Sequence, residues 1–479
     1  MSRPSLFVKL TYGAGQGTVS ALETTHLYYF VPFFTVALGV PGSLVGLAAF
    51  IGTALDALAD PLMGHYSDGF RSRRWGRRHL FMLVGAPLLA LFLALLFNPP
   101  AGLTTWGIFW WLLLFSTLAR FAMTVNYIPY LSLGAELTTD YDERTSIANW
   151  RNMFGFALGT TLSFFLWLVF IQPSPQHPTG WTDPAAFGKF GLLAAGIALF
   201  GGLVAFWGTF RLVPQRPQPP TEARARPWWS AYADLIAASR LPSFQSAVGG
   251  WVGFMALYGA HAALITTVNG YYWGLSGSQQ FLSVAAYSIA TLPGGALAAY
   301  LCRRFQKRTA ALIGVFGFVG LHVLLYALDF AGLMPPRGTT ALVAAMIGLL
   351  TLSLVFLVSL YATVYSMKAD VTDDLELITG RRQEGVVFAA SSFGQKLTAG
   401  VGGLLAGIGL DLIRFPVQAA ASDVPPDVLR NLGLMMGLAM PVIAVIPIAL
   451  FWRYRLDRAR HGDIQRELAG ARSATMSPA

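Results

Sequence analysis

The chain has 479 residues, of which 55% are hydrophobic and only 12% are charged, and its net charge is +10 at pH 7. Soluble proteins carry roughly 25% charged residues, so this composition excludes a large soluble domain and predicts a protein embedded in a lipid bilayer. The basic excess is expected in loops on one side of the membrane, which leaves no basic domain for nucleic acid. The single cysteine, Cys302, excludes an internal disulfide framework.

About twelve apolar runs are long enough to cross a bilayer as helices. In chain order, they cover residues 12–39, 42–65, 79–98, 105–132, 151–172, 187–212, 246–272, 278–302, 309–332, 339–367, 386–410 and 429–452. Connections rich in arginine and lysine alternate with nearly uncharged ones, and basic loops face the cytoplasm. We therefore predict an all-α, multi-pass protein of the cell's inner (plasma) membrane with both termini in the cytoplasm.

The second apolar run contains two acids, Asp56 and Asp60, followed by Pro61. Their i, i+4 spacing places both carboxylates on one helix face. An ionised acid at the centre of a bilayer costs roughly 2.5–3.5 kcal/mol on insertion scales, and two neighbouring acids also repel each other. One acid should therefore hold a proton, or both should share a cation. This pair predicts a cation-coupled transporter.

Other functions would leave different signs in the sequence. No nucleotide-binding Gly-Lys-Ser/Thr loop and no His/Cys cluster with metal-ligand spacing occurs, so we expect no ATP-driven pump and no cofactor besides a coupling ion. An uncoupled facilitator remains open. A membrane-embedded enzyme that uses Asp56 and Asp60 as acid and base is a further, more remote alternative.

A proline-rich polar stretch, residues 214–220, interrupts the helices, and residues 228–236 read as an amphipathic surface helix. We therefore divide the chain into an N-terminal six-helix half (1–213), a cytoplasmic linker (214–245), a C-terminal six-helix half (246–455) and a cytoplasmic tail (456–479). Arginine-rich loops follow both the second and the eighth run, a weak internal repeat that is typical of secondary transporters.

The loop after the second run contains Asp68 together with five arginines, including Arg71 and Arg77. Asp68, Arg71 and Arg77 are candidates for a conformational latch that holds helix ends together in one state. The alternative is a solvated loop that only sets the topology.

Four segments together resemble the glycoside–pentoside–hexuronide:cation symporter family of the major facilitator superfamily. They are Asp56/Asp60-Pro61, the Trp75-Gly76-Arg77 turn, residues 128–151 and residues 370–396. The resemblance spans essentially the whole chain. It implies the major facilitator fold and secondary active import of a sugar or glycoside-like solute with Na⁺ or H⁺. We expect a monomer.

The resemblance also implies roles for individual residues. Asp56 and Asp60, with the hydroxyl of Thr124, match the family's cation site, and the two acids would be the Na⁺ ligands if coupling is to sodium. Lys396 and Arg151 match charged residues that couple the ion to the conformational change.

The expected sugar site departs from the family pattern. Ser20 and Tyr127, with Asn126 beside the latter, stand where the family has acids that hold sugar hydroxyls. Ala59 replaces a cation-site asparagine, which favours H⁺. Glu23 is a further substrate candidate, as is Arg120, which alternatively balances the acids. These departures leave open a cation-coupled lysophospholipid or other amphiphile transporter on the same fold.

Overall fold

The computed structural model describes residues 4–70, 72, 74–76, 78–138, 141–177, 180–211, 236–380, 384–419 and 423–476. Within these ranges the regular structure is helical, without strands. Ten of the described helices are long and apolar enough to cross a membrane. The predicted all-α membrane fold of the major facilitator type is confirmed.

The first predicted helix, 12–39, is a series of short helical segments rather than one rod. These are α1 (Leu6–Ala14), α2 (Gly17–Thr24), the π-turn η1 (Thr25–Tyr29), α3 (Phe30–Pro32) and the π-turn η2 (Phe33–Ala37). The break between α1 and α2 falls at Gly15, where a Cβ would lie 2.6 Å from the ring of Tyr130. Glycine is needed there because Tyr130 and Ala205, from two other helices, approach the backbone so closely.

The remaining helices of the first half follow the predicted order. They are α4 (Gly42–Gly69), α5 (His79–Leu96), α6 (Thr105–Glu136), α7 (Tyr141–Phe165) with the π-turn η3 (Leu166–Phe170), and α8 (Pro184–Phe210). Thr104 accepts a hydrogen bond from the backbone N–H of Gly107 and Asp183 accepts one from Ala185, so side chains cap the starts of α6 and α8.

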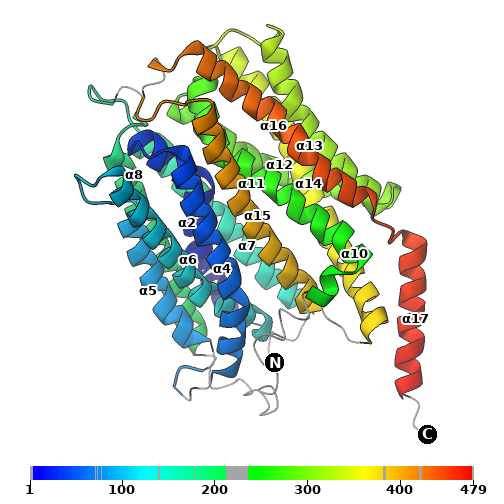
Figure 1. Ribbon diagram of the computed structural model, residues 1–479. Coiled ribbons are helices and arrows are strands. Elements are labelled where there is room, and N and C mark those ends of the chain that lie inside the picture. Colours follow the sequence, from blue (N-terminus) through cyan, green and yellow to red (C-terminus); the bar gives the residue numbers. More distant parts are fainter. Residues whose placement is uncertain are drawn as a thin grey trace. The chain divides into compact units, whose positions relative to one another are not determined.

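The described helices that follow α8 begin with α10 (Pro242–Phe244), which is labelled in Figure 1. They continue with η6 (Gln245–Gly249), α11 (Gly250–Thr267), η7 (Val268–Tyr272), α12 (Gly277–Arg304), α13 (Lys307–Phe330), α14 (Thr340–Thr379), α15 (Glu384–Leu412), α16 (Pro426–Trp452) and α17 (Arg458–Met476). The ten candidate spans do not include the divided first helix or α15, which correspond to the predicted runs 12–39 and 386–410.

The largest departures from the predicted helices are extensions in polar sequence. Helix α14 ends at Thr379 rather than at 367, α7 begins at Tyr141 rather than at 151, and the predicted tail contains the helix α17. These extensions are polar, so a search for apolar runs misses them. The expected amphipathic helix at 228–236 falls almost wholly on residues outside the described ranges.

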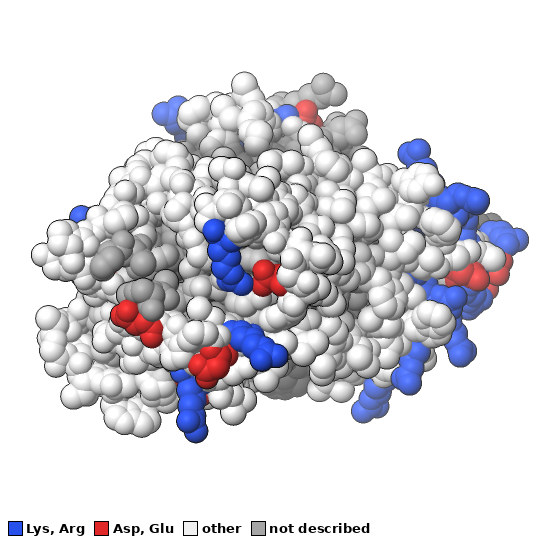
Figure 2. Space-filling view, turned by 90° about the horizontal axis from the view of Figure 1, so that it is seen from above, with Lys and Arg blue, Asp and Glu red and all other residues white. Residues whose placement is uncertain are grey.

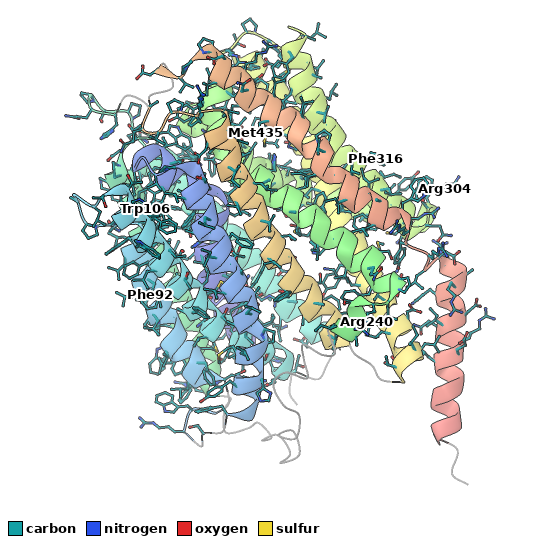
Figure 3. All side chains as sticks on the ribbon, viewed as in Figure 1. Phe92, Trp106, Arg240, Arg304, Phe316 and Met435 are labelled. Atoms are coloured by element: carbon teal, nitrogen blue, oxygen red, sulfur yellow. The ribbon has the colours of Figure 1, made fainter. Side chains whose placement is uncertain are left out.

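The exterior is largely apolar. Trp106 on α6 and Phe316 on α13 are 60% and 55% exposed (Figure 3), and exposed apolar side chains of this kind suit contact with lipid. Figure 2 looks at the molecule from above and shows few charged side chains on the face turned to the viewer.

The chain forms two compact units. The first unit contains Met1–Trp228, Gly259–Val284 and Gly400–Leu432, and the second contains Trp229–Tyr258, Ala285–Ala399 and Gly433–Ala479. In the first unit α4 packs against α6, and in the second α13 packs against α14. These units mix segments from both sequence halves, and the predicted boundaries at 213, 245 and 455 stay a prediction.

Candidate functional site

The two acids of α4 meet a hydroxyl of α6 in the first unit. Asp56 is fully buried and Asp60 is half-buried. The Thr124 Oγ1 lies 2.5 Å from Asp56 Oδ1 and 3.0 Å from Asp60 Oδ1. The structure therefore brings together the three residues that the sequence predicts for a cation site.

A buried arginine stands on the other side of Asp56. Arg120, one helical turn before Thr124 on α6, is 7% exposed, and its Nη1 lies 3.6 Å from Asp56 Oδ2. Gly52 on α4 faces it, with an ideal Cβ position 3.7 Å from Arg120 Cδ. Of the two roles considered for Arg120, this geometry favours balancing the charge of the acids.

The hydroxyl between the two carboxylates limits their protonation. A threonine hydroxyl has one hydrogen and can donate to only one carboxylate at a time. When Thr124 donates to one of the two carboxylates, its contact with the other is favourable if that other carboxyl group carries a proton and donates it to Thr124 Oγ1. A bound cation between the oxygens would serve equally well. The arrangement can hold one small positive ion: a proton on Asp60, or Na⁺ coordinated by carboxylate and hydroxyl oxygens.

A second cluster surrounds Arg151 on α7. Its guanidinium lies near the phenol groups of Tyr12, Tyr127 and Tyr130. The rings of Tyr12 and Tyr130 stack with centroids 4.5 Å apart. Each of these two hydroxyls donates to the backbone carbonyl of the other tyrosine, over 3.3 and 2.8 Å. The two hydrogen bonds and the ring stack between Tyr12 and Tyr130 hold α1 against α6 beside Arg151.

Ser20 joins α2 to α7 near this cluster. Its Oγ donates to the Gly155 carbonyl over 2.9 Å, and Gly155 lies one turn after Arg151. Ser20, Tyr127 and Arg151 therefore lie on helices that pack together, as a shared solute site requires. Their substrate and coupling roles stay predictions.

Two further predicted substrate residues have different surroundings. Asn126 is buried and its amide donates to the Met82 carbonyl of α5 over 3.0 Å, so its side chain is engaged with α5. Glu23 is half-buried on α2 and has no ion-pair partner within the described part of the chain. Lys396 belongs to the second unit, and its coupling role stays a prediction.

The latch predicted from the sequence consists of Asp68, Arg71 and Arg77. Arg71, Arg77 and the side chain of Asp68 lie outside the described residues.

A neighbouring arginine, which sequence reasoning passed over, does join helix ends. Arg78 is 5% exposed; its Nη1 donates to Ser67 Oγ over 2.7 Å and its Nε to Glu136 Oε1 over 3.2 Å. It thereby connects the end of α4, the start of α5 and the end of α6. Five similar arginines in one loop gave no signal that singles out Arg78.

The second unit contains a corresponding junction. Lys307, at the start of α13, lies 2.7 Å from both carboxylate oxygens of Asp370 near the end of α14. The Tyr454 hydroxyl donates to Asp370 over 3.1 Å. Burial and the negative charge of Asp370 raise the pKa of Tyr454 well above its ordinary value, which keeps this hydroxyl a donor.

An all-helical multi-pass fold with acids buried between packed helices is typical of membrane transporters, and the family and relatives that the chain matches are membrane transporters, not enzymes. A family model described as MFS/sugar transport protein matches residues 11–458. The chain belongs to this family, the glycoside–pentoside–hexuronide:cation symporters of the major facilitator superfamily.

Two relatives show the range of names in the family. The isoprimeverose transporter of Lactiplantibacillus pentosus is 25% identical over 81% of this chain and 76% of its own length. The sodium-dependent lysophosphatidylcholine symporter 1 of Gallus gallus is 24% identical over 89% of this chain and 82% of its own length.

A solved structure supports the fold. A bacterial homologue of the human lysosomal transporter Spinster has a TM-score of 0.67 at 13% identity, covering 96% of this chain and 97% of that one. At this identity the likeness concerns the fold alone.

Proposed function

We propose that this transporter is a cation-coupled symporter that imports a sugar or glycoside-like solute by alternating access. The observation that carries the proposal is the Thr124 hydroxyl placed between the carboxylates of Asp56 and Asp60. Binding of one Na⁺ or H⁺ removes the repulsion between these acids, so the ion can favour one conformation over another. The relative that is named as an isoprimeverose transporter supports a glycoside as the solute.

The orientation and location belong to the same proposal. The alternation of basic and uncharged loops favours an inner-membrane protein with both termini in the cytoplasm. We expect a monomer to be sufficient, because the acids, Thr124 and Arg120 all come from one chain.

The central test is Asp60→Asn in purified protein reconstituted into liposomes. An amide keeps the shape of the carboxyl group but neither takes up a proton nor carries a charge for Na⁺. Uptake of radiolabelled isoprimeverose or methyl β-glucoside, driven by an imposed Na⁺ or pH gradient, should fall at least tenfold. The protein should still elute as folded material in size exclusion.

The matched control is Asp463→Asn, which changes a carboxylate on α17 that pairs with Arg466. It should leave uptake at the wild-type level. Gradient-driven uptake that persists in Asp60→Asn would contradict the proposal. Wild-type uptake that ignores both gradients would indicate an uncoupled facilitator.

A second candidate solute is a lysophospholipid, because one relative is named as a lysophosphatidylcholine symporter. A thermal-shift panel separates the two, since a bound solute raises the melting temperature by mass action. Stabilisation by lysophosphatidylcholine, and by none of the sugars with or without Na⁺ at two pH values, would replace the glycoside with the lipid.

A further inference from the structure

A lysine of the second unit lies in an aromatic setting. Lys368 on α14 is 7% exposed, and its ammonium nitrogen lies 4.8 Å from the ring centre of Trp251 on α11. Trp251 is itself 3% exposed. The indole ring supplies a cation–π contact but no oxygen that could accept the three ammonium hydrogens.

The acids nearest in sequence are engaged elsewhere. Asp370 binds Lys307, Asp373 accepts from His461 and Gln465, and Asp374 accepts from Ser243. Among the carboxylates whose side chains the structure describes, none lies within ion-pairing distance of Lys368. Enclosing most of a lysine side chain without a counter-ion is unfavourable, so an anion that reaches the ammonium would be a favourable partner.

The surroundings of Lys368 hold the aromatic ring in place. Trp251 Nε1 donates to Gln395 Oε1 of α15 over 3.1 Å. The ring of Tyr361, two helical turns before Lys368, meets Trp251 edge-on with centroids 4.5 Å apart. Trp251, Tyr361 and Gln395 belong to the same compact unit as Lys368, and together they fix the ring beneath the ammonium.

We propose that Lys368 and Trp251 form a binding site for an anionic group of the transported solute, a carboxylate or a phosphate. The ammonium supplies the charge and the hydrogen-bond donors, while the Trp251 ring holds the side chain when no solute is bound. This proposal rests on the proposed transport function and narrows its substrate class to acidic solutes.

The experiment compares solutes that differ in one charged group. Thermal-shift titrations on purified full-length protein use methyl β-glucoside, methyl β-glucuronide, glucose 6-phosphate and lysophosphatidylcholine, with Na⁺ and at two pH values. Wild-type protein should bind at least one of the acidic solutes roughly 10- to 100-fold more tightly than methyl β-glucoside, as expected for a charge-assisted hydrogen bond. Tight binding of methyl β-glucuronide would identify the anionic group as a carboxylate. Tight binding of glucose 6-phosphate would identify it as the phosphate of a soluble sugar, and tight binding of lysophosphatidylcholine as the phosphate of a lipid headgroup.

The variants assign that preference to Lys368. Lys368→Met and Lys368→Gln should lower the affinity for the acidic solute by the same 10- to 100-fold, and Lys368→Arg should retain most of that affinity. Lys189→Met, which replaces an exposed lysine on α8, is the matched control and should change nothing.

Two results overturn this assignment without touching the proposed symport. One is equal wild-type affinity for neutral and acidic glycosides, and the other is a preference that survives in both Lys368→Met and Lys368→Gln. Absence of binding by every sugar at both pH values, with or without Na⁺, contradicts the proposed glycoside symport itself, and the acidic site falls with it.

Discussion

The hydroxyl of Thr124 is the smallest group on which the cation site depends. It contacts both acids, so its removal takes away an oxygen ligand and the hydrogen bridge between the carboxylates. Thr124→Val keeps the shape of the side chain. It should weaken the ion-dependent rise in melting temperature, with apparent cation affinity falling about threefold to tenfold, the worth of one hydrogen bond.

The measurement is a Na⁺ titration at fixed pH and a pH titration without Na⁺. Thr124→Ser restores the hydroxyl and should behave like the wild type. An unchanged titration in Thr124→Val would remove this residue from the site and leave the acids alone as candidates.

At the scale of single residues, the structure places Asp56, Asp60 and Thr124 together, as the family resemblance implies, and their role in cation binding stays a prediction. An i, i+4 pair of acids in an apolar helix is conspicuous because its burial is so unfavourable. Arg120 was a candidate either for binding substrate or for balancing the charge of the acids. The sequence could not choose between these roles, because spacing along α6 does not show whether Arg120 faces Asp56. The sequence predicts Lys368 in a basic loop, because the apolar run ends at 367. The structure places Lys368 within α14 and shows that its side chain is buried.

At the scale of helices, α4 receives its N-terminal cap from a distant part of the chain. The carboxylate of Asp411 on α15 accepts from the backbone N–H groups of Gly42 and Ser43, over 2.9 and 2.8 Å. Gly407 allows this approach, since a Cβ there would clash with the Gly42 carbonyl. The cap satisfies two N–H groups and places negative charge at the positive end of the helix.

Replacing this cap should affect both stability and transport. Asp411→Ala should lower stability by about 1–2 kcal/mol, as for other lost caps, seen as a lower melting temperature. It should also change the rate of solute uptake, because a contact between α4 and α15 must open and close if the predicted halves alternate.

Asp183→Ala is the comparison for that variant. Asp183 caps α8 from the adjacent residue, so its loss should lower the melting temperature with little effect on uptake. If Asp411→Ala and Asp183→Ala alter uptake equally, the cap on α4 has only a structural role.

The sequence predicts a helix boundary well where hydropathy changes at the end of the helix, and it misses the boundary where the helix continues into polar residues. The cores of α5 and α8 match the predicted runs within a few residues because apolar residues end where the helices end. In the polar extension of α14 and in the charged helix α17, no change in hydropathy marks where the helix ends. They are held by contacts such as Asp373 with His461 and Gln465, which depend on tertiary structure.

For the whole molecule, the internal repeat predicted from the loops has a structural counterpart. Arg78 with Glu136 joins α5 to α6 in the first unit, and Lys307 with Asp370 joins α13 to α14 in the second. Each pair links the start of one helix to the end of the next. The all-α membrane fold was predictable from composition, and its major facilitator type from the family resemblance. The compact units were not predictable, because they depend on which helices are in contact.

Asp370 also secures the C-terminal helix, which gives a prediction for the molecule as a whole. Lys307, Tyr454 and His461 all approach its carboxylate. Asp370→Asn should loosen α17 and make it cleavable by trypsin at its arginines about tenfold faster, as followed by gel electrophoresis. Asp463→Asn should not, and equal cleavage rates in the two variants would show that α17 is held by other contacts.

The length of α14 has a mechanical consequence. Its 40 residues span about 60 Å at 1.5 Å per residue, roughly twice the hydrocarbon thickness of a bilayer. Such a rod acts as a lever: a tilt of about 10° around a point within the lipid would sweep its far tip through roughly 5 Å, given this reach. Spectroscopic labels near Thr379 should therefore register a swing that labels at mid-membrane depth barely sense.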